Sequence, residues 1–186
     1  HPVTTSNGKE VEVYLPHGIW YDVDDLTRHE GSGYKKIPVT LSKLPVFQRG
    51  GSVIPRKRRV RRSSQQMRKD PITLTVALDS NGEARGDLYQ DDEHTFNYKT
   101  HNAFRRVQYE FSGLTLKSRV VDDEVSSFQP ENQIERIEVL GLKFVPSRVY
   151  SGSTELEFKY DAETDLLTVR KPGVVAAARF DVVFEK

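Results

Sequence analysis

The sequence predicts an all-β protein built from two antiparallel β-sandwich domains. Hydrophobic residues alternate with polar residues in short runs, as in strands with one buried and one wetted face. Turn signals separate these runs, and no stretch has the period of a helix. Short strands with frequent turns are typical of sandwiches, and alternation favours antiparallel over buried parallel sheets.

The clearest predicted strands follow one another along the chain. They share an alternation of larger apolar side chains with polar or small ones, and they cover residues 72–78, 107–111, 155–160 and 180–184. The turns between the strands are rich in glycine, serine, asparagine or proline: Ser80-Asn81-Gly82, Ser112-Gly113, Ser151-Gly152 and Lys171-Pro172-Gly173.

A polar, charged segment without apolar periodicity divides the chain. This basic linker loop covers residues 56–69, so we predict a proximal domain over 1–69 and a distal domain over 70–186. The residues before the loop are few for a core of their own. We therefore expect the proximal sandwich to be incomplete and to pack on a part of the protein that precedes His1.

The composition excludes several classes of function. The 28 Lys and Arg residues balance 27 Asp and Glu residues, so the overall charge of +1 points to neither nucleic acid nor membrane as a partner. The absence of cysteine excludes disulfides, thiolate metal sites and a cysteine nucleophile. No apolar run approaches the roughly 18 residues of a membrane span. The chain begins at His1 without a signal peptide, which suggests a processed chain or a fragment.

The run from Arg56 to Arg62 carries six positive charges in seven residues. The favoured interpretation is a solvated, protease-sensitive loop between domains. A polyanion-binding patch is an alternative, but no aromatic residues interleave to stack on bases. A processing or localisation signal is the third possibility.

The cluster Asp91-Asp92-Glu93-His94 has oxygen and nitrogen atoms that could bind a hard cation. Its spacing does not match a calcium loop, so we favour a hairpin turn whose carboxylates accept backbone N–H groups. As glycosidase acids the adjacent Asp91 and Asp92 are poor candidates. Two such carboxylates must flank a sugar, and neighbouring strand residues point to opposite faces.

Trp20, the only tryptophan, stands in the run Gly18-Ile19-Trp20-Tyr21-Asp22. Its aromatic ring could stack on a sugar, but a structural role inside a sandwich is favoured. The five histidines form no zinc-binding pair, and Gly31-Ser32-Gly33 is not a nucleophile elbow. We therefore predict no catalytic, cofactor-binding or metal-binding residue in this chain.

The segment from Leu44 to Pro55 predicts a buried joint. A short apolar strand meets Gly50-Gly51, where positive φ or close backbone contact is possible, and a second apolar pair follows. We expect Phe47, Val53 and Ile54 to be buried against a neighbouring part of the protein.

Three ordered motifs resemble those of glycoside hydrolase family 31. Residues 13–22 resemble its YLP-x-G-x-WYD segment, residues 45–55 its P-x-F-x-RGGS-x-IP segment, and residues 87–96 its LY-x-DDG segment. Glu93 departs from the glycine that is frequent there, which implies a different hairpin turn. The stretch 61–78 is most similar to the glucosidase II branch of the endoplasmic reticulum.

The resemblance implies the architecture that surrounds this chain. In the family a (β/α)₈ barrel carries a retaining mechanism with an Asp nucleophile and an Asp acid/base, and proximal and distal β-sandwiches follow it. No WNDMNE-like nucleophile motif stands in this sequence, so no catalytic residue is assigned here. The implied role is non-catalytic support of the barrel.

The resemblance further implies an α-glucosidase that trims glucose from N-linked glycans in the endoplasmic reticulum lumen. Its implied partners are the catalytic barrel portion of the same enzyme, a glucosidase II β subunit and an oligosaccharide substrate bound mainly outside this region. No cofactor is implied. The residues alone leave two alternatives open: a stand-alone carbohydrate-binding module using Trp20, and an adhesion-type sandwich that binds polyanions through Arg56–Arg62.

Overall fold

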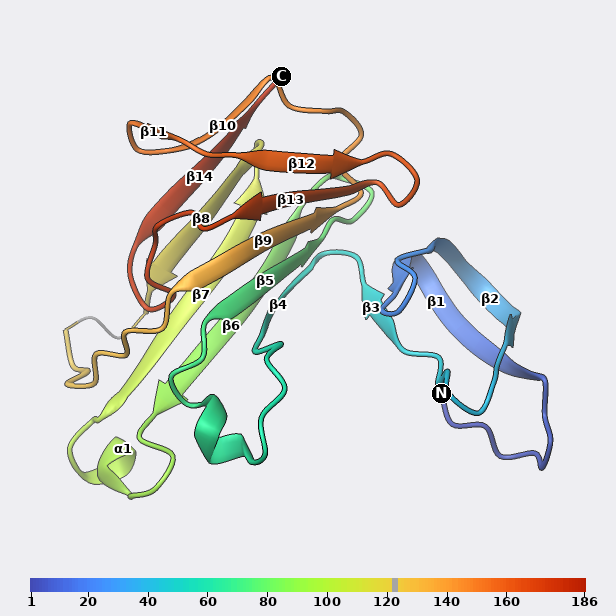
Figure 1. Cartoon of the computed structure of the whole chain (residues 1–186), viewed down its shortest axis with the longest axis horizontal. Coiled ribbons are helices and arrows are strands. Elements are labelled where there is room, and N and C mark those ends of the chain that lie inside the picture. Colours follow the sequence, from blue (N-terminus) through green and yellow to red (C-terminus); the bar gives the residue numbers. More distant parts are fainter. Residues whose placement is uncertain (122–123) are drawn as a thin grey trace.

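The computed structural model describes residues 1–121 and 124–186, and strands dominate its regular structure. The predicted all-β fold class is confirmed. A small sheet comes first (blue in Figure 1). It contains three antiparallel strands in the order β2-β1-β3: β1 (Glu10–Asp22), β2 (Arg28–Pro38) and β3 (Phe47–Arg49).

The remaining strands form an 11-stranded sheet that folds over into a two-layer sandwich (Figure 1). One layer contains β4 (Ser52–Arg56), β5 (Ile72–Ala77), β9 (Ile134–Leu140), β13 (Leu166–Arg170) and β12 (Phe158–Asp161). The other contains β6 (Ala84–Asp91), β7 (Phe104–Ser112), β8 (Thr115–Val120), β14 (Phe180–Glu185), β10 (Arg148–Ser151) and β11 (Thr154–Glu155). The layers meet at a parallel pairing of β4 with β6. Two short helices, η1 (Ser64–Met67) and α1 (Asn97–Thr100), lie in loops.

The main core lies between the two layers. The inward-facing residues of β7 and β14 are buried, as the alternation in 107–111 and 180–184 predicts. They belong to one hydrophobic cluster with Leu74 and Val139 from the opposite layer. Tyr109 donates its phenolic hydrogen to the carbonyl oxygen of Ala176 at 2.7 Å, so its polar atom is also satisfied inside the core.

β5 departs from the predicted alternation of a buried and a wetted face. All of its residues are buried, and even Thr73 and Thr75 are only 0% and 4% exposed. One face joins the core, while Arg58 from the basic segment donates to Thr75 Oγ1 on the other face. β5 pairs in parallel with β9, which is also mostly buried. The prediction of antiparallel pairing is therefore wrong for β5 and β9. The physical reason is that parallel strands are typical of sheets covered on both faces.

A β-bulge in β1 changes which side chains face the sandwich. The pairing register with β2 shifts between Leu15 and Gly18, so one extra residue enters β1. Before the bulge Leu15 packs into a small core of the first sheet, and after it Trp20 packs there as well. Ile19 and Tyr21 consequently point to the opposite side and contact the sandwich.

The chain passes from the small sheet to the sandwich at Gly50-Gly51, since β3 pairs with β1 and β4 pairs with β5. Residues 57–71 therefore connect neighbouring strands of the same layer, whereas the sequence predicted a connection between domains. The division into domains 1–69 and 70–186 stays a prediction.

Candidate functional site: the joint between the sheets and the basic segment

An apolar cluster joins the small sheet to the sandwich. Ile19 and Tyr21 from β1 pack with Ala77 of β5 and Leu140 of β9. Tyr21 is 2% exposed, and its hydroxyl donates to the carbonyl oxygen of Leu78 at 2.8 Å. Burial disfavours the charged phenolate and raises the pKa of Tyr21 to about 12. The tyrosine thus anchors one sheet on the other through both an apolar ring and a polar tip.

The two glycines of the joint have different physical roles. Gly50 donates its backbone N–H to Ile19 O at 2.8 Å, and a Cβ there would lie 2.8 Å from Leu78 O. Gly51 has a φ of +88° and donates to Ala77 O at 2.8 Å. The predictions of close contact and of positive φ at this pair are both confirmed.

The apolar residues around the glycines are buried to different degrees. Val53 is 3% exposed and belongs to the main core, as predicted. Phe47 and Ile54 are only half-buried, and Phe47 packs on the small core of the first sheet. The predicted burial of these two residues is therefore only partial.

Gln48 is a residue of the joint that sequence reasoning missed. It is 4% exposed, and its amide nitrogen donates to Thr75 O at 3.1 Å and to Ser52 Oγ at 3.2 Å. Its Oε1 accepts a hydrogen bond from the guanidinium of Arg56 at 3.3 Å. A lone polar residue in a short strand gives no sequence signal of this kind, because its partners come from other strands.

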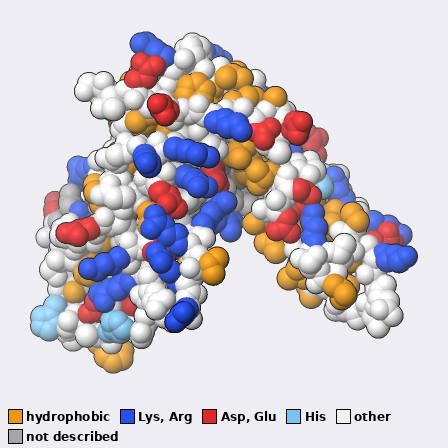
Figure 2. Space-filling model, viewed as in Figure 1, with side chains coloured by type: hydrophobic (Ala, Val, Ile, Leu, Met, Phe, Trp, Pro, Cys, Tyr) orange, Lys and Arg blue, Asp and Glu red, His pale blue; other side chains and the backbone are white. Residues whose placement is uncertain are grey.

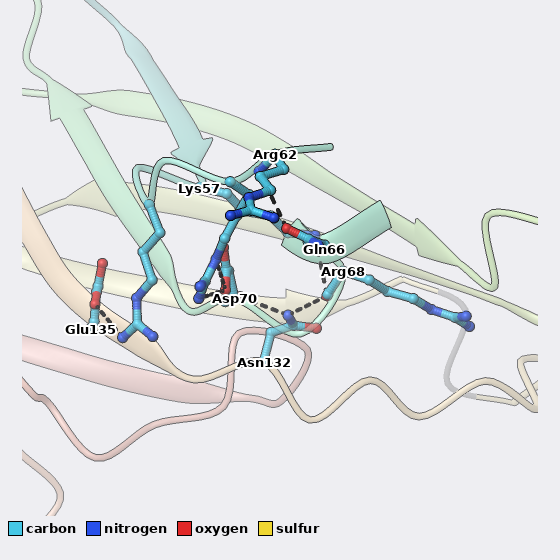
Figure 3. A network of polar contacts seen from close by, with 9 residues as sticks. Lys57, Arg62, Gln66, Arg68, Asp70, Asn132 and Glu135 are labelled. Carbon is cyan, nitrogen blue, oxygen red and sulfur yellow. Dashed lines mark hydrogen bonds and ion pairs between the residues drawn. The ribbon is translucent and has the colours of Figure 1, made fainter. Parts of the chain in front are cut away.

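The basic segment is fixed to the sandwich by ion pairs. Arg58 contacts Glu138 at 2.6 Å and Arg59 contacts Glu135 at 3.2 Å, both carboxylates belonging to β9. Figure 3 shows Glu135 beside the segment. Although Val60 at the centre of the run is 98% exposed, the neighbouring arginines bind the sheet. The predicted solvated loop is thus exposed but not free.

A bidentate contact joins Arg61 to Asp70. The guanidinium donates to both carboxylate oxygens, with Nη2 to Oδ1 at 2.7 Å and Nε to Oδ2 at 3.0 Å. Asp70 is 4% exposed, and the hydrogen bond from Arg61 holds the pKa of its carboxyl below the usual value. This two-pronged contact closes the loop that leads from β4 into β5.

The acidic cluster is a turn, as predicted. Asp91 Oδ1 accepts the backbone N–H of Glu93 at 2.8 Å, and Asp92 Oδ1 accepts those of His94 and Thr95 at 3.1 and 2.9 Å. Hydrogen bonds from the Thr95 hydroxyl and backbone lower the pKa of Asp92 to about 2. Glu93 has a φ of +60°, a conformation that a glycine adopts without strain.

Trp20 is half-buried, so its predicted burial inside a sandwich is only partly confirmed. One side of the indole packs on the small core, and its N–H donates to Pro16 O at 2.9 Å. The Arg49 guanidinium carbon lies 5.8 Å from the ring centroid. These contacts give the ring a structural role, as the sequence favoured.

Residues 1–121 and 124–186 contain no group of three or more His, Cys, Asp or Glu side chains placed to hold a metal ion. No helix among the same residues has the length and hydropathy to cross a bilayer. What the described arrangement offers is a rigid joint between two sheets and an anchored basic surface.

Comparisons with known proteins agree with this architecture. Residues 1–54 match the family model described as "Glycosyl hydrolase family 31 C-terminal domain". The chain is 45% identical to neutral alpha-glucosidase AB of Homo sapiens over 98% of its own length and 20% of the relative. It therefore spans about a fifth of the length of such curated relatives.

Solved structures give the same result for the fold. A crystal structure of glucosidase II alpha subunit with alpha3-Glc2 bound matches 98% of this chain and 22% of its own, with a TM-score of 0.84 and 27% identity. A crystal structure of the ER glucosidase II heterodimeric complex, with the binding domain of the regulatory subunit, matches equally well, with a TM-score of 0.84. The sequence motifs, the paired sheets and these matches together place the chain in glycoside hydrolase family 31, within its C-terminal region.

Proposed function

We propose that this chain is the non-catalytic C-terminal region of a retaining α-glucosidase that removes glucose from N-linked glycans. In this proposal the chain supports a catalytic barrel in the same protein. The observation that carries the proposal is the 45% identity to neutral alpha-glucosidase AB along 98% of the chain. The sequence lacks the family's nucleophile motif, which favours a structural role for this region beside the catalytic barrel.

The surface of the small sheet supports a contact with the rest of such an enzyme. Large hydrophobic side chains are exposed there: Tyr34 is 71%, Leu44 54% and Val46 47% accessible. Figure 2 shows hydrophobic groups on this sheet, which projects from the sandwich. Tyr34 lies in β2, and Leu44 and Val46 lie in the connection before β3. Exposed apolar surface of this kind is typical of a contact with another part of a protein. We infer that the barrel portion covers it.

We further propose that the enzyme works in the endoplasmic reticulum lumen with a β subunit. The support is the similarity to a catalytic subunit whose solved complex contains the binding domain of a regulatory subunit. A tagged β subunit should co-purify with the protein that carries this chain, and that protein should co-fractionate with endoplasmic reticulum markers. Recovery of the protein without the β subunit, or from another compartment, would contradict this part of the proposal.

The activity is tested with the intact protein that contains these residues. We expect it to release glucose from a glucosylated N-glycan, with the released sugar first appearing as the α-anomer in proton NMR because the mechanism is retaining. The 186-residue chain alone should release none. An intact protein without glucosidase activity, or activity in the chain by itself, would overturn the proposal.

A further inference from the structure

We propose that a depression at one end of the sandwich binds a neutral, hydroxyl-rich ligand of the oligosaccharide class. The inference goes beyond the proposed function, because it concerns binding by this region and not hydrolysis. The cavity has a volume of about 530 Å³, within the roughly 300–1,000 Å³ of small-molecule sites. It lies among the segment after η1, the end of β6 and the loop before β9.

The charges around the depression favour a neutral ligand. Arg68 and Lys69 supply two positive charges, and Asp91, Glu93 and Glu131 supply three negative ones. Neither sign dominates, so the site offers no electrostatic basis for a polyanion, which needs clustered cations. Side chains of both signs with amides between them can both donate hydrogen bonds to hydroxyl groups and accept hydrogen bonds from them.

A pair of hydrogen-bonded amides forms the polar part of the site. Asn132 is 7% exposed, and its amide nitrogen donates to Arg68 O at 2.9 Å and to Asp70 O at 2.8 Å. Its Oδ1 accepts the amide N–H of Gln90 at 2.9 Å. Figure 3 shows the hydrogen bonds that link Asn132 to Arg68 and Asp70, just before β5. The backbone thus fixes Asn132, and Gln90 is held through its amide nitrogen on this fixed acceptor.

Gln90 has one hydrogen-bonding atom that the protein leaves unused. Its Oε1 is covered and has no hydrogen-bond partner among residues 1–121 and 124–186. A covered acceptor without a donor is destabilising. The Gln90 side chain is half-buried and lines the depression, so a ligand there lies beside this atom. A ligand hydroxyl that donates to Oε1 after a small turn of this side chain would satisfy the atom.

The loop before β9 provides the apolar contact. Phe128 and Pro130 are half-buried and border the depression beside the exposed Gln129 and Glu131. The negative face of an aromatic ring attracts polarised C–H groups, such as those on one face of a sugar. A depression lined by both an aromatic ring and amides therefore suits a ligand with both C–H and hydroxyl faces.

The test uses calorimetric titration of the intact protein with α-linked mannotriose and with cellotriose. Neither saccharide has an α-glucosidic bond, so an α-glucosidase does not consume them. We expect at least one to bind, and we expect Phe128→Ala and Gln90→Leu to weaken its binding at least tenfold. Phe96→Ala is the matched control, because Phe96 is 74% exposed and lies outside the depression.

Thermal melting of each variant shows whether it folds, and Phe128→Ala in an exposed loop is the decisive one if Gln90→Leu unfolds. Failure of both saccharides to bind the wild-type protein would overturn the inference. Equal binding by wild type, Phe128→Ala and Phe96→Ala would overturn it as well. An active glucosidase without saccharide binding here would refute only this inference, whereas binding in an inactive protein would refute only the proposed function.

Discussion

At Gly50 and Gly51 the backbone itself restricts which residues the joint accepts. Gly50 lies so close to the Leu78 carbonyl that a side chain has no room, while Gly51 has a backbone conformation that side chains disfavour. The two restrictions are independent, since one concerns space and the other concerns the φ angle. The adjacent β3 and β4 belong to different sheets because of this turn.

Gly51→Val should destabilise the protein. A φ of +88° strains any residue with a Cβ, and a β-branched residue most of all, so we expect a loss of about 1–3 kcal/mol in the free energy of unfolding. Thermal melting of the intact protein measures it. Ala162→Val, at an exposed position without positive φ, is the control. An unchanged melting temperature for Gly51→Val would show that the turn does not constrain the joint.

Tyr21→Phe should lower stability by about 1–2 kcal/mol, because it leaves the buried Leu78 carbonyl without its hydroxyl donor. Urea unfolding at neutral pH measures this loss. Tyr34→Phe, at a 71% exposed position, should change stability little.

The raised pKa of Tyr21 predicts that the free energy of unfolding depends on pH. Its pKa is about 12 in the folded state and near 10 when unfolded, so its contribution is complete below pH 10 and is lost as the pH rises toward 12. The stability advantage of wild type over Tyr21→Phe should therefore fall over pH 10–12, by up to roughly 1.4 kcal/mol per pH unit, and the advantage of about 1–2 kcal/mol should disappear within this range. A constant difference across this range would contradict the assignment of the shift to Tyr21.

At the scale of elements, one inserted residue in β1 allows this strand to contribute side chains to two hydrophobic clusters. The bulge between Leu15 and Gly18 reverses the alternation, so Trp20 continues the small core while Ile19 and Tyr21 reach the sandwich. A regular strand would place all odd-numbered residues on one face. The motif YLP-x-G-x-WYD therefore contains a change of face that its spacing alone does not reveal.

The loop between β4 and β5 is exposed but closed by the contact of Arg61 with Asp70. Asp70→Asn removes the charge and one acceptor oxygen from that contact, so the loop should open more often. We expect trypsin to cut after Arg61 and Arg62 several-fold faster in this variant, as measured by mass spectrometry of timed digests. Glu135→Gln, which weakens the more exposed pair with Arg59, is the control and should have a smaller effect. Equal cleavage rates in wild type and Asp70→Asn would show that the contact does not restrain the loop.

At the scale of the whole molecule, the small sheet and the sandwich are held together by a few buried side chains. Ile19→Ala removes apolar contacts with Ala77 and Leu140, and we expect a loss of about 2–4 kcal/mol. In the 186-residue chain, Trp20 is the only tryptophan and lies in the small sheet, so the tryptophan fluorescence of this chain reports that sheet alone. In Ile19→Ala the fluorescence transition should come at lower urea than the circular dichroism transition of the sandwich. Coincident transitions in this variant would show that the sheets unfold as one unit without this contact.

The sequence by itself determined the all-β class, the strands β5, β7 and β14, the glycine joint, the acidic turn and the family, whereas the predicted strand 155–160 is divided between the end of β11 and β12. These features depend on alternation, turn residues and motifs, which are local properties of the chain. Only the tertiary structure decided that β5 is buried on both faces beside β9, that Gln48 lies inside the joint and that the basic segment binds the sandwich. The partners in these contacts come from distant parts of the chain, as when Arg58 meets Glu138. Long-range contacts depend on how whole strands pack, and no local pattern records that.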